Sequence, residues 1–201
     1  MARPQSPDYD RRRAAILAAA ARLYARRGFR GASIADLAKA CKASKSLVYH
    51  YFPSKEDILH QVMASHLDAL VAASAETTRS GSAEARLRAL TLAFMRLYVD
   101  AQDSQKVLLN ELDNLPPDAR GEVIGKQRRI IATVEALISE IRPDTGPLSL
   151  PLTMLFFGMI NWTHTWFRPE GRVASDSLAN MAVDLILDGL RAPSLGRGSQ
   201  S

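Results

Sequence analysis

The chain of 201 residues is 47% hydrophobic and contains only 10 prolines and 11 glycines, a composition that is typical of globular proteins and excludes a largely disordered chain. Residues 1–60 carry 12 Lys and Arg against 5 Asp and Glu, whereas the remaining residues carry 14 against 16. The basic excess therefore lies entirely in the N-terminal segment. This asymmetry favours a polyanionic partner for that segment, although from charge alone a solvated basic face is the simpler interpretation.

Cys41 is the only cysteine of the chain, so an intrachain disulfide and a cysteine cluster for zinc are excluded. The first ten residues contain no apolar stretch of the kind found in a secretory signal. The most apolar run, residues 150–160, has about half of the ~20 residues that a membrane-spanning helix needs. We therefore expect a cytoplasmic protein with no membrane partner.

Hydrophobic residues recur with a helical period along almost the whole chain, and no segment alternates as a strand would. The predicted fold class is therefore all-α, with about nine helices. The expected helices cover residues 8–27, a second that begins at Ser33, a short third that begins at Ser44, 55 to the mid-70s, 83–101, 104–114, 117–141, 148–167 and 175–190. Residues 1–7 and 192–201 are expected to be flexible tails.

Three serines stand where helices are expected to begin. Ser33 and Ser54 are each followed three residues later by an aspartate, a spacing that resembles a capping box. Ser44 opens the short third helix, and a turn near residues 41–43 joins it to the second. Two helices joined in this way predict a DNA-binding helix-turn-helix.

The second helix of such a motif places its first residues against base edges in the major groove. These positions are occupied by Ser44, Lys45, Ser46 and Leu47. The hydroxyl and ammonium groups fit base edges or phosphates, and the leucine fits a thymine methyl group. Tyr49 and His50 are expected toward the DNA backbone. Lys55 and Ser33 each stand at a helix start, where free N–H groups and the helix dipole favour a phosphate.

Residues 11–59 resemble the DNA-binding domain of the TetR/AcrR family of transcriptional regulators. The resemblance is carried by R-R-A-A-I-L-A-A-A at 12–20, Gly28-Phe29, S-I-A-D-L-A at 33–38, Ser44-Lys45 and V-Y-H-Y-F-P-S-K-E-D-I-L at 48–59. It implies a homodimer that places one short recognition helix of each subunit in successive major grooves of a palindromic operator. It also implies that Ser33, Tyr49, His50 and Lys55 contact phosphates. Taken singly, Tyr51 fits a core position equally well, and Cys41 fits a packing role better than that of a reactive thiol.

Two residues depart from the family's pattern. Lys42 stands at the turn position where the family usually has glycine, and Ser46 stands where glycine is frequent. A non-glycine residue adopts the left-handed conformation at a cost of ~1 kcal/mol, so we expect the turn to persist and Lys42 to add a phosphate contact. Ser46 adds a hydroxyl near the bases, so the operator sequence cannot be inferred from those of relatives.

The resemblance divides the chain into a helix-turn-helix DNA-binding domain at 8–54 and a helical ligand-binding and dimerisation domain at 55–191, whose last two helices pack against those of the partner. The apolar stripe on the expected helix at 148–167 fits a core or a subunit interface better than a ligand pocket. The candidate ligand-binding residues are Phe94, Tyr98, Leu108, Leu112, Met154, Phe157, Asn161, Trp162 and Thr165. Asn161 and Thr165 each need a polar partner if they are buried.

Residues 157–172 and 108–120 are similar to a subset of the family that responds to acyl-CoA thioesters and includes regulators of fatty-acid, steroid and phenylacetate catabolism. A CoA ligand needs cations near its phosphates. Lys126, Arg128 and Arg129 form a basic cluster on the expected helix at 117–141, although a solvated helix face is the simpler interpretation for each of them singly.

The sequence therefore predicts a ligand-responsive transcriptional repressor that binds double-stranded DNA as a homodimer and is released by a small effector, with an acyl-CoA or aromatic acyl-CoA as the candidate. The alternatives are a regulator of drug efflux that binds lipophilic compounds, and an architectural DNA-binding protein without an effector. An enzyme is not expected, because the four histidines form no metal-binding pair and there is no nucleophile elbow or Gly-rich phosphate loop. No catalytic residue, metal or cofactor is expected.

Overall fold

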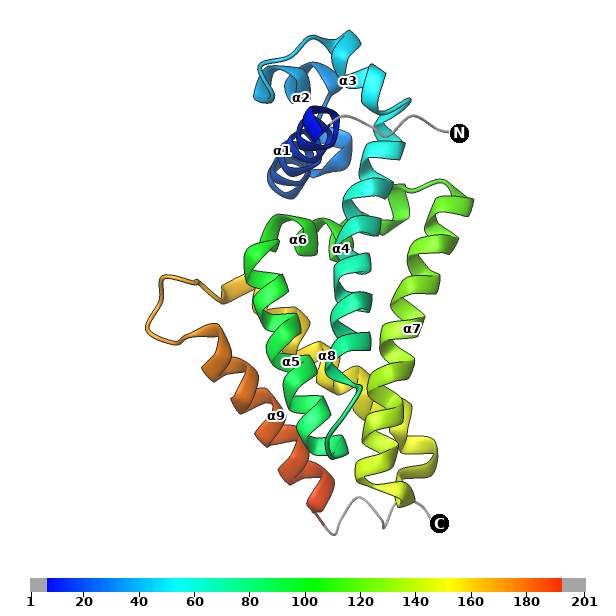
Figure 1. Cartoon of the computed structure of the whole chain (residues 1–201), viewed down its shortest axis with the longest axis vertical. Coiled ribbons are helices and arrows are strands. Elements are labelled where there is room, and N and C mark those ends of the chain that lie inside the picture. Colours follow the sequence, from blue (N-terminus) through cyan, green and yellow to red (C-terminus); the bar gives the residue numbers. More distant parts are fainter. Residues whose placement is uncertain (1–6, 193–201) are drawn as a thin grey trace. The chain divides into compact units, whose positions relative to one another are not determined.

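The computed structural model describes residues 7–192, and this part of the chain contains nine α-helices, two short 3₁₀ helices and no strand. The predicted all-α class with about nine helices is confirmed (Figure 1). The α-helices are α1 (Pro7–Gly31), α2 (Ile34–Ala40), α3 (Lys45–Tyr51), α4 (Lys55–Thr77), α5 (Ala83–Asp100), α6 (Gln102–Asn110), α7 (Pro117–Ile141), α8 (Ser149–Trp166) and α9 (Ser175–Arg191). The 3₁₀ helices are η1 (Leu112–Asn114) and η2 (Pro143–Leu148). The predicted tails lie outside the described residues, except for Pro7, which begins α1, and Ala192, which is the C-cap residue of α9.

The chain forms two compact units. The first unit comprises residues 1–67 and 101–124, and the second comprises residues 68–100 and 125–201. Helices α4 and α7 contribute residues to both. Within the described range, no helix is long and apolar enough to span a membrane.

The core of the first unit is built from α1, α2, α3 and α6. Helix α1 packs along α6, and α2 packs against α3. Tyr24, Leu37 and Phe52 are almost completely buried there, and the ring of Tyr24 meets that of Phe29 edge to face at 5.5 Å. Burial of such side chains contributes about 1.5–3 kcal/mol each, so packing of these faces stabilises the short helices.

Helix α1 was expected to end at residue 27 but continues to Gly31 through a kink at Gly28. Gly28 has φ 71° and ψ 160°, a backbone conformation that L side chains rarely adopt. A side chain at this position would also approach Glu111 Oε1 at 3.4 Å. The glycine therefore lets the chain leave the helical path and turn toward α2.

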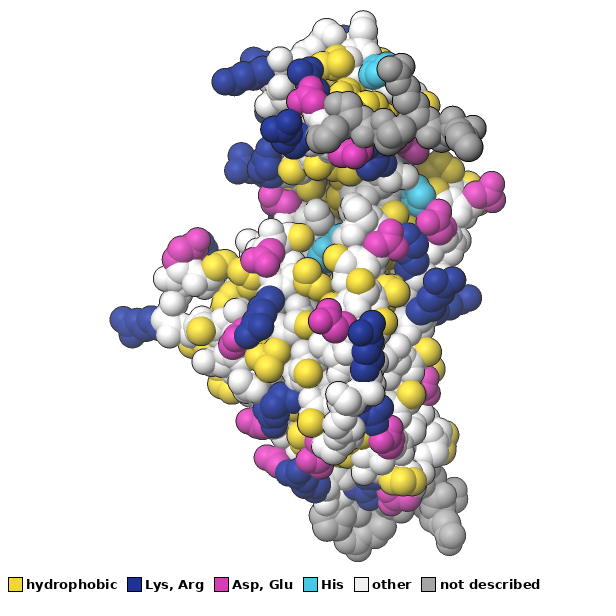
Figure 2. All heavy atoms as spheres, in the orientation of Figure 1, with side chains coloured by type: hydrophobic (Ala, Val, Ile, Leu, Met, Phe, Trp, Pro, Cys, Tyr) yellow, Lys and Arg dark blue, Asp and Glu magenta, His cyan; other side chains and the backbone are white. Residues whose placement is uncertain are grey.

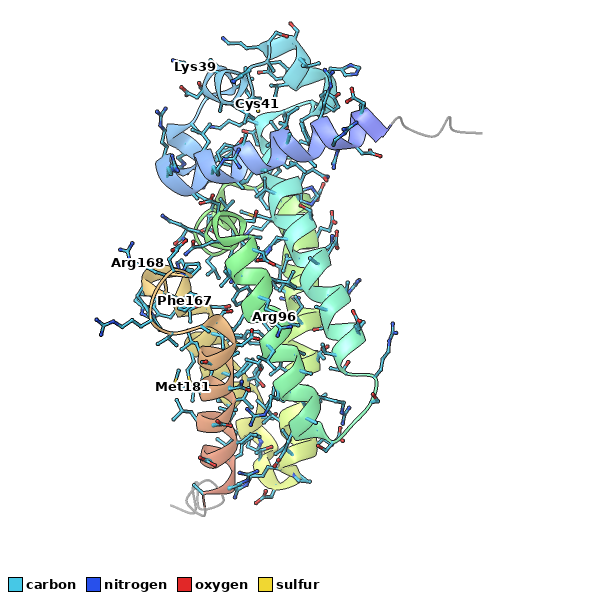
Figure 3. The ribbon with its side chains drawn as sticks, turned by 60° about the vertical axis from the view of Figure 1, so that its left-hand side comes forward. Lys39, Cys41, Arg96, Phe167, Arg168 and Met181 are labelled. Carbon is cyan, nitrogen blue, oxygen red and sulfur yellow. The ribbon has the colours of Figure 1, made fainter. Side chains whose placement is uncertain are left out.

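In the second unit, α5 lies along α9 over most of its length (Figures 1 and 3). Leu87 and Phe94 of α5 and Val183 of α9 are fully buried. Arg96, labelled in Figure 3, donates two hydrogen bonds to the Asp176 carboxylate, and this contact lowers the pKa of Asp176. Exposed ion pairs contribute only about 0–1 kcal/mol each, so buried apolar side chains supply most of the stability of this helix pair.

The sixth helix differs from its predicted range at both ends. The helix expected at 104–114 begins at Gln102 and stops at Asn110, because Glu111 leaves the helical region with φ −117° and ψ 8° and η1 follows it.

At the C-terminal end of α9, the Arg142 guanidinium donates hydrogen bonds to the backbone carbonyl oxygens of Leu190 and Ala192. A cation at a helix C-terminus satisfies the last carbonyls and opposes the helix dipole.

Candidate nucleic-acid interface and effector region

The predicted capping box at the start of α2 is present. The backbone N–H of Asp36 donates to Ser33 Oγ at 3.1 Å, and the backbone N–H of Ser33 donates to Asp36 Oδ2 at 3.0 Å. The Ser33 hydroxyl itself donates to the same carboxylate oxygen at 2.6 Å, which, with the backbone bond, lowers the pKa of Asp36. Because its only proton is used inside the box, Ser33 reaches a phosphate through this hydroxyl only if the bond to Asp36 opens.

Helix α3 carries the exposed polar side chains that the sequence places near the bases. Ser44 accepts a hydrogen bond from the backbone N–H of Leu47 at 3.1 Å and so caps the helix. Ser44, Lys45 and Ser46 are exposed and Leu47 is half-buried. Val48 on the opposite face is fully buried. The capping bond therefore fixes α3 with its polar N-terminal turn facing solvent.

The turn between α2 and α3 is completed by Lys42. Its φ of 52° makes it the one non-glycine residue with positive φ in the described range. The backbone N–H of Ala43 donates to Ala38 O at 2.9 Å and closes the turn. The left-handed conformation expected at Lys42 is thus confirmed, and the side chain of Lys42 is exposed.

Lys55 opens α4 and is half-buried. Its ammonium nitrogen lies over the Phe29 ring, 4.1 Å from the ring centroid. A cation–π contact of this kind contributes about 0.5–1 kcal/mol at exposed sites and restricts where the ammonium group points. Figure 2 shows further Lys and Arg side chains gathered over α1 and α2.

An aromatic cluster joins the first turn of α1 to the end of α3. The ring of Tyr9 packs against that of Tyr51 with centroids 4.6 Å apart, and it meets His50 edge to face at 6.4 Å. Nearby, Arg13 donates to Gln61 Oε1 at 2.7 Å. Sequence reasoning missed Tyr9 and Arg13, because residues about forty positions apart carry no local signal of their contact. Tyr51 is half-buried against Tyr9, while Tyr49 is 52% exposed.

Cys41 lies at the C-terminal end of α2 (Figure 3) and is half-buried. Burial raises the pKa of its thiol, against a smaller opposing effect of Arg22. A protonated thiol is a poor nucleophile, which supports the packing role expected for this residue. Among residues 7–192, no three His, Cys, Asp or Glu side chains gather as metal ligands.

The residues predicted to bind a ligand fall into two sets. Phe94, Tyr98 and Phe157 are buried in the second unit, and the rings of the first two lie 6.2 Å apart. Leu108 is buried and Leu112 half-buried in the first unit. Asn161 is half-buried, and its backbone carbonyl oxygen lies 2.7 Å from Nδ1 of His164.

Met154, Trp162 and Thr165 are instead exposed on α8. The Thr165 hydroxyl donates to the carbonyl oxygen of Trp162 at 2.8 Å, so its polar partner comes from its own helix. These three residues belong to an apolar face of α8 and α9, which we call the α8–α9 face. Its large exposed side chains are Leu150, Met154, Leu155, Trp162, Trp166, Met181 and Leu185. Met181 marks its position on α9 in Figure 3.

Each unit contains a cleft among its described residues. One, of about 270 Å³ in the first unit, is lined by Ser54, Glu56, Asp57, His60 and neighbouring residues, and its carboxylates disfavour an anionic ligand. The other, of about 130 Å³ in the second unit, lies between α4 and α7 and includes Arg129. Within the predicted basic cluster, Lys126 is paired with Asp68 at 2.7 Å, whereas Arg128 and Arg129 are exposed.

Comparison with known proteins agrees with this arrangement of helices. Residues 16–62 match the model of bacterial regulatory proteins of the tetR family, and residues 80–190 match that of the tetracyclin repressor-like C-terminal domain. The crystal structure of a TetR-family transcriptional regulator from Bordetella parapertussis is similar with a TM-score of 0.85 and 40% identity, over 88% of this chain and 94% of that one.

Two further relatives carry more specific descriptions. The HTH-type transcriptional repressor KstR2 of Rhodococcus jostii is 28% identical over 90% of this chain and 92% of its own length. The structure of AibR in complex with isovaleryl coenzyme A and operator DNA is similar with a TM-score of 0.77 and 25% identity, over 87% of this chain and 97% of that one.

Proposed function

The chain belongs to the TetR family of bacterial transcriptional regulators, and we propose that it is a repressor that binds a palindromic operator as a homodimer and releases it when an acyl-CoA binds. Regulators of this family bind DNA operators as dimers, respond to small molecules and are not enzymes. The observation that carries the proposal is the capped α3, which presents Ser44, Lys45 and Ser46 to solvent above the buried Val48.

For the DNA contacts, we propose that the first turn of α3 reads base edges, with Lys45 fitting guanine or phosphate and the serine hydroxyls fitting either. Lys42, Tyr49, His50 and Lys55 then contact phosphates on either side of α3. In support, Lys42, Tyr49 and His50 are exposed around this helix. Ser33 is better described as the cap of α2, since its proton is already donated to Asp36.

The dimer is proposed to form through the α8–α9 face. Trp162 and Leu185 are 65% and 68% exposed in the single chain, and large apolar side chains that gather in this way mark protein–protein contacts. Leu155, Trp162 and Trp166 follow one another at helical spacings of seven and four, so they share one side of α8. A second copy of this chain would bury all of them. The exposed Met154 and Trp162 thus fit this contact better than a ligand pocket.

The effector is proposed to be an acyl-CoA, held with its acyl group beside buried aromatic residues such as Phe94 and Phe157. Two observations support this class. AibR, similar along most of the chain, was solved with isovaleryl coenzyme A and operator DNA. Arg128 is an exposed cation of the same unit, which suits the phosphates of CoA.

The test starts with selection of the full-length protein's binding sequence from random DNA, followed by anisotropy titrations at several salt concentrations. We expect a two-fold symmetric site and an affinity that falls steeply with salt, because phosphate contacts release counterions. Acyl-CoA thioesters, the matching free acids and lipophilic drugs are then added to the complex. Release by thioesters alone supports the proposal. Release by drugs alone would show an efflux-type regulator, and release by none of the compounds would leave an architectural protein.

A further inference from the structure

The cleft between the second half of α4 and the middle of α7 combines three properties that point to a small ligand. It has a volume of about 130 Å³, it carries a buried hydroxyl without a partner, and a guanidinium group stands among its lining residues. The cleft is lined by Val71, Ser74 and Ala75 of α4, by Thr78 directly after α4, and by Arg129, Ile130 and Thr133 of α7. All of them belong to the second unit.

The hydroxyl of Ser74 is the second of these properties. Ser74 is only 5% exposed, and its Oγ has no hydrogen-bond partner among the described residues. Other hydroxyl residues of this segment donate back to the helix: Ser65 to Gln61 O, and Thr78 to Ser74 O. A buried hydroxyl without a partner is unfavourable. The group is therefore free to bind whatever occupies the cleft.

The positive charge of Arg129 determines which charge a ligand of the cleft should carry. No carboxylate of the described chain lies within ion-pair distance of Arg129, in contrast to Lys126 on the same helix, which pairs with Asp68. An unpaired guanidinium group favours a carboxylate or phosphate and disfavours a cation. The site therefore suits an anion.

The walls select the rest of the ligand. Val71, Ala75 and Ile130 present hydrocarbon, and the hydroxyl of Thr133 is already donated to Arg129 O at 3.0 Å. A phosphate, with charge on all sides, would lose hydration against such walls without a compensating bond. A carboxylate with a short apolar tail fits better: Ser74 and Arg129 can compensate the lost hydration of its two oxygens, and its tail can lie against the hydrocarbon walls.

We propose that this cleft binds a short-chain monocarboxylate, whose carboxylate accepts a hydrogen bond from Ser74 Oγ and pairs with Arg129 while its tail lies on Val71, Ala75 and Ile130. A cavity of ~150 Å³ accommodates one benzene ring, so the volume suits a tail that gives the acid about four to six carbons. The cleft shares no residue with Phe94, Tyr98, Phe157 or Asn161, and the inference does not rest on the acyl-CoA proposed above.

The experiment measures binding of sodium valerate to the full-length protein by calorimetry and by the shift of the melting temperature, with sodium chloride at equal ionic strength as the blank. So small a ligand is expected to bind in the millimolar range. Arg129→Gln and Ser74→Ala should each weaken binding roughly tenfold or more, since each removes one partner of a charged group. Arg172→Gln is the matched control: it removes the same charge from an exposed residue of the same unit outside the cleft and should leave binding unchanged.

Ser74→Ala also provides a second readout. If the hydroxyl has no partner in the free protein, its removal should leave the melting temperature of the free protein unchanged or raise it. Equal weakening by Arg172→Gln, undiminished binding in Ser74→Ala, or no binding of valerate to the unmodified protein would each overturn the proposal. Valeryl-CoA has no free carboxylate, so its competition for this cleft would do the same. Binding of valerate without any response to acyl-CoA would retain this site while rejecting the proposed effector.

Discussion

The helix-turn-helix segment of the first unit and the α8–α9 face of the second present their side chains to solvent for different reasons. In the first, exposed polar residues lie on short helices whose N-termini are capped by hydrogen bonds between residues only three positions apart, such as that between Ser44 and Leu47. In the second, apolar side chains as large as Trp162 remain mostly exposed within the described part of the chain. One chain suffices to hold the polar side chains of the first surface in place. The apolar side chains of the second surface are expected to be buried only by a partner subunit. The predictions below separate the two.

The largest expected effect comes from placing a charge in the α8–α9 face. Leu185→Glu should convert the dimer into a monomer, because a carboxylate cannot be buried there without a partner. Loss of the linked second half-site should then weaken operator binding by about 10²–10⁴-fold. Sedimentation and anisotropy measure the two effects. Ala72→Glu, at an exposed position of α4, is the control. A Leu185→Glu protein that remains dimeric would place the interface elsewhere.

Next in size is Lys55→Gln, which addresses the DNA-binding surface alone. Removal of one phosphate contact per subunit should weaken binding about tenfold and reduce the salt slope by about one per subunit. The dimer should persist. Lys106→Gln removes a charge from an exposed residue of α6 in the same unit and should change neither quantity. An unchanged salt slope in Lys55→Gln would show that the ammonium group serves only its contact with Phe29.

Tyr9→Ala tests whether α1 helps to position α3. Loss of the ring contact with Tyr51 should cost about 1 kcal/mol, or roughly fivefold in operator affinity, since aromatic pairs contribute about 0.5–1.5 kcal/mol. Tyr9→Phe keeps the ring and should bind as the unmodified protein does. Because Tyr9→Ala removes no positive charge, its salt slope should be unchanged, which distinguishes positioning from phosphate contact. Equal losses in both variants would point to the phenolic hydroxyl instead.

The same contrast explains how much the sequence could predict. The capping box at Ser33, the cap at Ser44 and the positive φ of Lys42 depend on neighbours within three or four residues, so a local pattern contains them. The helix count follows from periodicity for the same reason. Contacts such as Tyr9 with Tyr51 join residues far apart in the chain and leave no periodic signal.

The effector region shows the limit more clearly. Periodicity placed Phe157, Asn161 and Trp162 near one face of α8, but it could not say which side of that helix would be covered. Phe157 is buried and Trp162 exposed in the same helix. The cleft at Ser74 was missed altogether, because it depends on one hydroxyl that does not donate back to its helix. Such a detail is decided by packing against another helix.

Lys42→Gly isolates the turn between α2 and α3 and is expected to have a smaller effect. Relief of the left-handed conformation stabilises the fold, while the greater freedom of glycine in the unfolded chain opposes this, for a net gain of about 0.5 kcal/mol. Operator affinity should nevertheless fall, because the ammonium group is lost. Chemical denaturation and anisotropy on the same protein measure the two quantities. A rise in both would show that Lys42 does not contact DNA.

The smallest effect concerns pH and a buried residue of the first unit. His66 is 5% exposed, and its Nε2 lies 2.7 Å from Gln105 Oε1. Burial lowers the pKa of His66, and the hydrogen bond with Gln105 only partly opposes this. The unfolded chain therefore binds a proton at this residue more readily than the folded protein does, so stability falls as the pH drops through the ordinary histidine value.

If His66 stays neutral in the folded protein, its protonation in the unfolded chain should lower the free energy of unfolding at about pH 6.5 by about 0.4 kcal/mol relative to neutral and higher pH. Urea denaturation of the unmodified protein and of His66→Gln, at about pH 7.5 and about pH 6.5, measures the difference in slope. His66→Gln should lose less stability over this interval, whereas His50→Gln, at an exposed position, should behave as the unmodified protein does. A His66→Gln protein with an unchanged pH dependence would show that His66 accepts its proton in the folded state as readily as in the unfolded chain.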